Sequence, residues 1–383
     1  MPHESHQPLL CLNAGSSSLS AAFFDGGDEA RWTAEIDLTA GTGPVIRAAD
    51  GTCETLDGPD PADFPAVAKS LLGRAEGAVP VHRIVHGGGA TTDAVWLDAP
   101  EMTRLGALSP LAPIHQPVNL SLVRALAEER PRRRQIGVFD TAFHRTMPPL
   151  ARALPVPAEG PFAGLRRYGF HGLSHEWVAH VMARSDTAPD RIVSLHLSGG
   201  ASACAIRGGV SVDTTMGATP LDGLMMGSRS GSLDPGLMLY ALGQGMEVEA
   251  LSELLWTGAG LKGLSGLSSD PRDITSAGGV EAEAAIALYC RRAAQAVARM
   301  AVSIGGIDAL VFTGGAGVEQ AGIRARIAGD LGWMGVVLDP EANDRHAPVV
   351  SPADSAVELR LVPPEEERVM ARHARYLIAR EEA

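Results

Sequence analysis

The chain has 383 residues, of which 45% are hydrophobic and 20% charged, a balance typical of a globular protein with two or three domains. Its formal net charge of −13 argues against nucleic acid and anionic membranes as partners, because both bind basic surfaces. The first residues lack a basic and apolar leader, no apolar run approaches ~18 residues, and the four cysteines show no C-x-x-C spacing. We therefore expect a cytoplasmic protein whose cysteines are reduced.

Two segments follow one plan: an apolar strand, a turn rich in Gly and Ser, and a second apolar strand. The first plan runs from residue 9 to 24 around the turn NAGSSSLS (13–20), and the second from 192 to 206 around HLSGGAS (196–202). This recurrence predicts two β-hairpins and a duplicated domain. Such turns expose N–H groups and hydroxyls that can hold a polyphosphate, although tight hairpins favour Gly and Ser in any case. The P-loop pattern is absent from the sequence.

The other predicted elements alternate between helices and strands, as in an α/β fold. We expect short strands and turns over 30–60, helices over 64–72, 118–129, 282–303 and the C-terminal residues, and strands over 81–85, 135–139, 309–313 and 357–362. The proline-rich residues 110–117 should be extended or turned. A second proline-rich stretch, 145–165, should connect the two halves.

Two carboxylates are candidates for binding magnesium, which takes oxygen ligands. Asp140 ends a predicted buried strand, a position where α/β sheets bind ligands, but it could equally cap the strand. Glu366 belongs to a run of three Glu residues at the start of a helix, where the helix dipole favours acids regardless of function.

Arginines and histidines suggest an anionic ligand. Arg83 and Arg229 each lie beside glycines at the end of an apolar segment, so they could bind a carboxylate and a phosphoryl group, or form structural ion pairs. No histidines show zinc-site spacing. We therefore favour, over a metal site, the hypothesis that an imidazole donates a hydrogen bond to a transferring phosphoryl group.

Long motifs, in order along nearly the whole chain, resemble acetate kinase and its acyl kinase relatives in the actin-like ATPase superfamily. They are LNAGSSSL (12–19), HRIVHGG (82–88), LAPIHQP (111–117), VFDTAFHRTMP (138–148), RRYGFHGLSH (166–175), SVDTTMGATPLDGLMMGSRSG (211–231), SGLSSDPRDI (265–274) and FTGGAG (312–317). The resemblance implies a duplicated actin-like, ribonuclease H-like α/β fold with an active-site cleft between two domains. We expect an N-terminal domain over 1–145 plus a returning helix at 367–383, and a C-terminal domain with the nucleotide-binding loops over 146–366.

The resemblance also implies the site residues. The catalytic group is Arg83, Asp140, His171 and Arg229. The acyl pocket is Arg83 with Val85, Ile114, Phe170 and Pro220. The nucleotide and phosphate contacts are Asn13, Ser16, Ser18, Ser20, His196, Leu197, Ser198, Gly199, Gly200, Asp270, Pro271, Arg272, Gly315, Ala316, Gly317, Val318 and Glu319. Asn13 and Glu366 would hold Mg²⁺, ATP would be the co-substrate, and the chain would form a homodimer.

The implied reaction is reversible phosphoryl transfer from ATP to acetate, giving acetyl phosphate and ADP. A carboxylate is ionised at pH 7 and needs no general base, so we interpret Asp140 as a metal or positioning group rather than a proton acceptor. Acetate is favoured because Val85 keeps the pocket small, with propionate or another short carboxylate as the alternative.

The nucleotide side departs from the family pattern. Ser20 stands where the family has Lys, and Gly199 where its HLGNG motif has Asn. The family's GIGEN and TNEE motifs are also altered, to GAGVE (315–319) and PEEE (364–367). A donor such as pyrophosphate, or a non-catalytic protein that binds nucleotide or acyl phosphate, therefore stays open. An actin-like filament former is a weaker third hypothesis.

Overall fold

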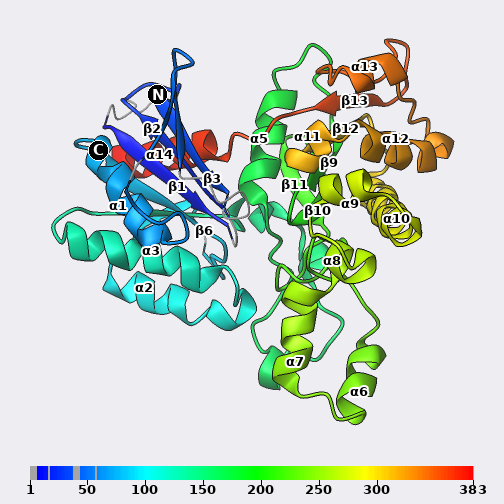
Figure 1. The fold of residues 1–383 in the computed structure, drawn as a ribbon, viewed down its shortest axis with the longest axis horizontal. Coiled ribbons are helices and arrows are strands. Elements are labelled where there is room, and N and C mark those ends of the chain that lie inside the picture. Colours follow the sequence, from blue (N-terminus) through cyan, green and yellow to red (C-terminus); the bar gives the residue numbers. More distant parts are fainter. Residues whose placement is uncertain (1–6, 16–17, 38–43, 57, 91, 383) are drawn as a thin grey trace. The chain divides into compact units, whose positions relative to one another are not determined.

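The structure is a computed structural model that describes residues 7–15, 18–37, 44–56, 58–90 and 92–382 (Figure 1). Its contacts divide the chain into two compact units, Met1–Ala142 with Glu365–Ala383, and Phe143–Pro364. Within the described ranges, no helix is both long and apolar enough to cross a membrane.

The first unit is built on an eight-stranded sheet in the order β5-β4-β3-β2-β1-β6-β8-β7. Its strands are β1 (Leu9–Ala14), β2 (Ser18–Phe24), β3 (Trp32–Asp37), β4 (Val45–Ala48), β5 (Cys53–Thr55), β6 (Val79–Ile84), β7 (Ala94–Trp96) and β8 (Ile136–Phe139). The predicted hairpin is confirmed, because β1 pairs antiparallel with β2 and places Asn13 opposite Ser20. On its other side β1 is parallel to β6, which is parallel to β8. The carboxyl ends of these three strands therefore share one edge of the sheet.

Helices cover this sheet. They are α1 (Phe64–Arg74), α2 (Ala99–Gly106), the 3-10 turn Ser109–Leu111, α3 (Gln116–Glu129) and α14 (Glu366–Glu382). α3 begins two residues earlier than predicted, because a proline is tolerated in the first turn, where its missing N–H is not needed. The apolar faces of α1 and α3 form one core with β1–β4. α14 lies against β1 and β6, with Met370 and Ile378 buried (Figure 1).

The second unit repeats the central part of this plan. Its sheet has the order β11-β10-β9-β12-β13. The strands are β9 (Arg191–Leu197), β10 (Ala201–Arg207), β11 (Val210–Thr214), β12 (Ala309–Thr313) and β13 (Glu358–Leu361). β9 and β10 form the second predicted hairpin, and β9, β12 and β13 run parallel. The arrangement matches β3-β2-β1-β6-β8 strand for strand, which confirms the duplicated α/β fold.

The helices of the second unit are mostly short. They are α4 (Pro149–Arg152), α5 (Gly172–Met182), α6 (Pro235–Gly243), α7 (Val248–Glu253), α8 (Gly260–Ser265), α9 (Pro271–Ala277), α10 (Val280–Ile304), α11 (Gly315–Glu319), α12 (Ala321–Asp330) and α13 (Pro340–Asp344). Further helical turns span Ala142–Thr146, Gly160–Phe162, Leu254–Gly258 and Gly332–Met334. The long α10 packs on β9 and β10 and ends at Gly305, whose φ of 74° confirms the predicted glycine cap (Figure 1).

All four cysteines are free, as expected. Cys11, Cys204 and Cys290 are buried, and Cys53 is exposed. Burial raises the pKa of Cys204 and of Cys290 to about 12. The buried thiols therefore act as packing residues.

Candidate active site

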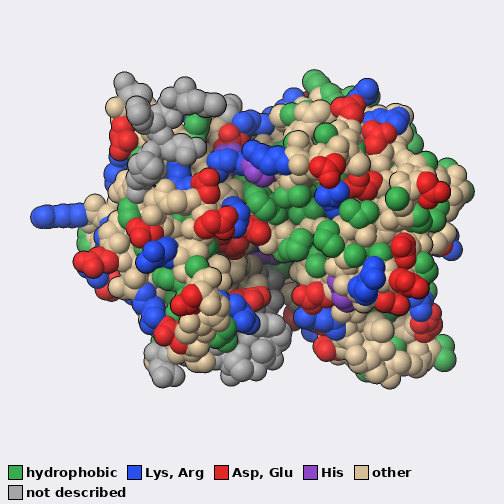
Figure 2. Space-filling view, turned by 90° about the horizontal axis from the view of Figure 1, so that it is seen from above, with side chains coloured by type: hydrophobic (Ala, Val, Ile, Leu, Met, Phe, Trp, Pro, Cys, Tyr) green, Lys and Arg blue, Asp and Glu red, His purple; other side chains and the backbone are tan. Residues whose placement is uncertain are grey.

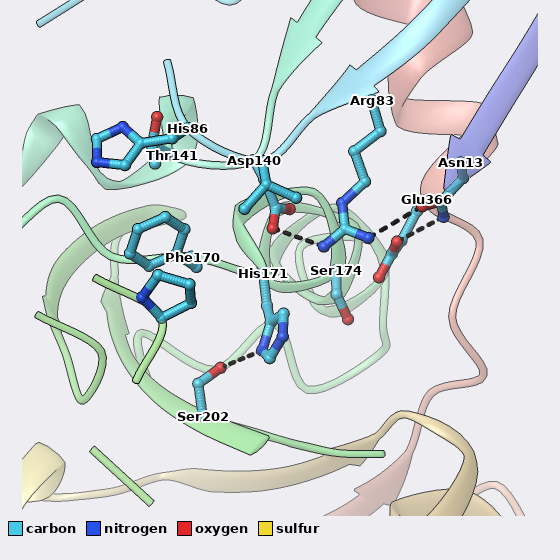
Figure 3. Close-up of polar contacts among 12 residues, drawn as sticks. Asn13, Arg83, His86, Asp140, Thr141, Phe170, His171, Ser174, Ser202 and Glu366 are labelled. Atoms are coloured by element: carbon cyan, nitrogen blue, oxygen red, sulfur yellow. Dashed lines mark hydrogen bonds and ion pairs between the residues drawn. The ribbon is translucent and has the colours of Figure 1, made fainter. Parts of the chain in front are cut away.

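Arg83 is the centre of the candidate site in the first unit. Its Nη2 donates to Asp140 Oδ2 at 2.8 Å and its Nη1 to Asn13 Oδ1 at 3.1 Å (Figure 3). Arg83 lies in β6, Asp140 follows β8 and Asn13 is in β1, so the shared edge of three parallel strands brings them together. The side chains of the Arg83–Asp140 pair are only 12% and 1% exposed. The predicted functional residues thus also form a buried ion pair.

Two further carboxylates join this cluster from the first turn of α14. Asn13 Nδ2 donates to Glu366 Oε2 at 2.8 Å and to Glu367 Oε1 at 3.1 Å. Burial raises the pKa of Glu366, and Asp140 and Glu367 add to this effect while Arg83 opposes it. Burial alone would lower the pKa of Arg83, but the same carboxylates raise it overall. The cluster has three carboxylates and one guanidinium.

An excess of carboxylate oxygens suits a divalent cation such as Mg²⁺. Among the residues that the structure describes, no group of three or more His, Cys, Asp or Glu side chains is arranged to hold a metal ion. A few protein oxygens combined with phosphate and water oxygens are the usual ligands of Mg²⁺ in phosphoryl-transfer sites. The donor set of Asn13, Asp140 and Glu366 therefore fits this ion.

The predicted acyl-pocket residues of the first unit lie near this edge of the sheet. Val85 directly follows β6 and is 2% exposed, and its N–H donates to Asn119 Oδ1 at 3.1 Å. Asn119 Nδ2 donates in turn to the carbonyl of Ala14. The buried amide of α3 thus ties the residue after β6 to the end of β1. Ile114 is half-buried in the turn before α3.

In the second unit, His171 and Arg229 lie close together. A Cβ atom on Gly200 would stand 2.8 Å from Arg229 Nη2 and 2.9 Å from His171 Nε2, so a larger residue there would displace at least one of the two side-chain ends. Arg229 is 5% exposed and donates from Nη1 to the carbonyl of Pro220 at 2.7 Å. His171 has a left-handed φ of 57°, a strained backbone conformation that often marks functional sites. Phe170, beside it, is buried.

The glycine-rich loops of the second unit adjoin one another. The turn after β9 is closed by a hydrogen bond from the Ser198 N–H to the Gly200 carbonyl at 2.9 Å. Gly314, which precedes α11, approaches so closely that a Cβ would stand 2.5 Å from the carbonyl oxygen of Leu197. The predicted third turn is therefore the N-terminal end of a short helix. The ring centroid of His196 lies 4.3 Å from that of His171, and the two ring planes are tilted by 30°.

Ion pairs of Arg272 connect α9 to α11. Arg272 donates to Asp270, with the shortest contact at 2.6 Å from Nη2 to Oδ2, and to Glu319 Oε2 at 3.2 Å from Nη1. The structure therefore brings the predicted nucleotide residues 270–272 next to 315–319. A cavity of about 200 Å³ lies beside them between α9, α10 and α12, lined in part by Ile274, Ile286 and Ile323.

Comparisons with known proteins show the family of this chain. The model of the Acetokinase family matches residues 8–372. An acetate kinase of Nitrobacter hamburgensis is 38% identical and covers 97% of this chain and 96% of its own. An acetate kinase of Synechococcus is 42% identical and covers 88% of this chain and 90% of its own. The chain belongs to the acetokinase family.

Solved structures of acetokinases show the same fold. The acetate kinase of Porphyromonas gingivalis is 32% identical with a TM-score of 0.81, over 97% of this chain and 99% of its own. A propionate kinase of Francisella tularensis is 31% identical with a TM-score of 0.85, over 96% and 98%. The duplicated actin-like fold expected from the sequence is thereby confirmed.

Ser20 shows how this acetokinase accommodates a departure from the family pattern. Ser20 Oγ donates to Glu367 Oε1 at 2.5 Å, and Asn13 donates to the same atom. Where the resemblance implies a lysine ammonium, this chain has a neutral hydroxyl bound to a carboxylate. Ser18, in the same strand, is exposed, and Ser16 lies outside the described residues.

Several residues at the site were missed by the sequence analysis. Glu367 was noted only as part of PEEE (364–367) and not as a site residue, and Asn119 belongs to none of the motifs, although a polar residue on an apolar helix face was a visible signal. Arg324 is 0% exposed and donates to the carbonyls of Gly317 and Val318 in α11, at 3.0 and 2.6 Å. It also donates to Asn343 Oδ1 in α13 at 2.7 Å, which a sequence pattern does not reveal.

Proposed function

We propose that this acetokinase catalyses Mg²⁺-dependent, reversible phosphoryl transfer between ATP and acetate, giving acetyl phosphate and ADP. The observation that carries the proposal is the buried Arg83–Asp140 pair beside Asn13 and Glu366, in a chain that matches the family over residues 8–372. A carboxylate nucleophile needs no deprotonation, so catalysis consists of positioning and charge neutralisation.

The proposed roles in this chemistry are carried by residues of both units. Arg83 and Arg229 carry fixed positive charges that can bind the acetate carboxylate and the transferring phosphoryl group. His171 donates a hydrogen bond to that phosphoryl group, and Asp140 orients Arg83. Val85, Ile114, Phe170 and Pro220 are the proposed contacts of the acetate methyl group.

The remaining predicted residues are proposed to hold the nucleotide and the metal. Asn13 and Glu366 would hold Mg²⁺, which would neutralise phosphate charge when bound. The phosphate and nucleotide contacts would come from the turn 13–20 and from residues 196–200, 270–272 and 315–319. The proximity of Arg272 to Glu319 supports this grouping for the last two segments.

The first experiment is hydroxylamine trapping of the acyl phosphate, with acetate or propionate as acceptor and ATP, GTP or pyrophosphate as donor. We expect turnover with ATP and acetate. Turnover only with another donor would indicate that Ser20 and Gly199 change which phosphoryl donor the protein uses. Ligand binding without turnover by any donor, in folded protein, would contradict the proposal and favour a non-catalytic binding protein.

Propionate is the second candidate acceptor. A propionate kinase is among the similar structures, with a TM-score of 0.85, and one methylene changes discrimination by only ~1–3 kcal/mol. The ratio of kcat/KM for acetate to that for propionate decides between the two acceptors.

We also propose that the protein is a cytoplasmic homodimer without nucleic acid or membrane partners. None of the residues of α6 is buried, and Leu239 and Tyr240 are 72% and 64% exposed, which supports a surface covered by a second copy. The net charge of −13 supports the absence of polyanionic partners. On the face drawn in Figure 2, acidic side chains are interspersed with basic ones over the coloured surface.

A further inference from the structure

The Nδ1 side of His171 belongs to a row of buried serines and histidines that crosses α5, β10 and β9. His171 Nδ1 lies 2.8 Å from Ser202 Oγ (Figure 3), and Ser202 Oγ lies 2.9 Å from His175 Nε2. His175 Nδ1 lies 2.8 Å from Ser194 Oγ. Ser194, Ser202 and His175 are each 0% exposed. The row therefore fixes the plane of the His171 ring from within the protein.

A count of protons restricts this row to two arrangements. Ser202 has one hydroxyl proton and two ring nitrogens as neighbours, so it donates to one ring and accepts from the other. Burial lowers the pKa of His175 well below its usual range, and His144 and His196 lower it further, so this ring is neutral and has a single N–H. If Ser202 donates to His171, then His175 donates to Ser202 and Ser194 donates to His175. The alternative reverses all three bonds.

The opposite edge of the His171 ring favours one of the two arrangements. A Cβ atom built on Gly200 would stand within 3 Å of both His171 Nε2 and Arg229 Nη2. The two nitrogens are therefore neighbours. A guanidinium is always charged, so a second positive charge on the neighbouring ring is electrostatically unfavourable. A neutral His171 can donate from Nε2 to an anionic group only if its Nδ1 accepts a hydrogen bond.

We propose that Ser202 is a positioning residue whose hydroxyl donates to His171 Nδ1 and thereby keeps the ring proton on Nε2, ready to donate to the transferring phosphoryl group. His175 and Ser194 complete the row and orient the Ser202 hydroxyl. The inference rests on the proposed role of His171 in the kinase reaction. It adds three residues, each of them 0% exposed.

Kinetics of Ser202→Ala is the first test. The variant removes the donor to Nδ1, so the ring proton moves between the two nitrogens and kcat should fall about 10-fold. The KM values for acetate and ATP should change less than about 2-fold, because the lost contact acts on the transition state. Ser194→Ala, one step further along the row, should lower kcat by a smaller factor.

Ser351→Ala is the matched control. Ser351 is a buried serine whose Oγ accepts a hydrogen bond from the Leu359 N–H at 3.0 Å, and neither residue has a proposed role in the reaction. This variant should keep the wild-type kcat. A fall in kcat as large as that of Ser202→Ala would contradict the proposal, because any buried serine would then have the same effect.

The tautomer itself is measured by ¹⁵N NMR of labelled histidines, with the His171 signals assigned from a His171→Gln variant. We expect a protonated Nε2 and an unprotonated Nδ1 in the wild type, and a mixture in Ser202→Ala. A wild-type ring protonated on Nδ1 alone, or on both nitrogens, would overturn the proposal. This measurement needs no turnover, so failure of the kinase assignment and failure of the tautomer assignment are separable. If Ser202→Ala does not fold, the wild-type spectrum and Ser194→Ala still decide.

Discussion

Gly200 is the residue whose small size matters most to the site in the second unit. Its missing side chain leaves the space in which Arg229 Nη2 and His171 Nε2 approach each other. Gly200→Ala should displace one of them and lower kcat/KM for acetyl phosphate formation about 100-fold, because small displacements of catalytic groups are costly. Gly329→Ala is the control, since a Cβ there meets nothing within 4 Å. An active, well-folded Gly200→Ala enzyme would contradict this reading of the contact.

Arg83 has a structural role as well as a proposed catalytic one. Arg83→Leu leaves Asp140 and Glu366 buried without their cation, so the free energy of unfolding should fall by about 3 kcal/mol. Adding Asp140→Asn removes one buried charge and should restore part of the stability without restoring activity. Urea unfolding of the single and double variants measures this coupling. If the losses in the free energy of unfolding of the two single variants simply add in the double variant, the interaction between Arg83 and Asp140 contributes nothing to folding.

Strand β6 contains a buried histidine, His82, whose charge state makes the stability of the protein depend on pH. His82 lies 2.7 Å from Gln135 Oε1, and burial lowers its pKa to about 4 from 6.5. In the unfolded chain this residue binds a proton near pH 6.5, while in the folded chain it stays neutral down to about pH 4. The free energy of unfolding therefore has its full value, as far as His82 is concerned, above pH 6.5. It falls as the pH drops from 6.5 toward 4.

Between pH 7 and pH 5, His82 alone should lower the free energy of unfolding by about 2 kcal/mol. Urea unfolding at the two pH values measures the change. His82→Asn should show a smaller pH dependence, while His175, whose pKa is also lowered by burial, contributes in the same direction in both proteins. An unchanged pH dependence in the variant would exclude His82 as a source.

Helix α11 depends on Arg324 of α12 for its position. The buried guanidinium binds carbonyls of α11 and the side chain of Asn343 in α13, which a lysine cannot do with one ammonium. Arg324→Lys should therefore raise KM for ATP several-fold and leave KM for acetate unchanged. Steady-state kinetics with each substrate varied in turn measures the split. A larger effect on acetate would show that α11 does not serve the nucleotide.

At the scale of the whole molecule, α6 is a helix with large apolar side chains exposed, among them Leu239 and Tyr240. If a second copy covers it, Leu239→Glu should convert the dimer to a monomer, because a charge at the centre of an apolar interface is costly. Sedimentation velocity measures the mass. Leu150→Glu, at a residue 88% exposed on α4, is the control and should stay dimeric. A wild-type protein that is itself monomeric would rule out the homodimer.

Much of the fold was predictable because its signals are local. The two hairpins were predicted because an apolar-turn-apolar plan occurs twice, and α10 because its apolar period ends on Gly305. The boundary of α3 was less predictable, since Pro117 fits both a turn and the first turn of a helix. Motifs such as HRIVHGG and VFDTAFHRTMP are long enough to identify the acetokinase family without the structure.

Residue identity and order were enough to predict the duplication, the family and the chemical types at the site. Which atoms meet depends instead on how the chain folds. Ser20 reaches Glu367 across 347 positions of sequence, and Ser202 stands between His171 and His175. A hydroxyl or a guanidinium has no periodic signature, and its partners depend on strand register and helix packing. Long-range polar contacts are therefore properties of the folded chain rather than of any local pattern.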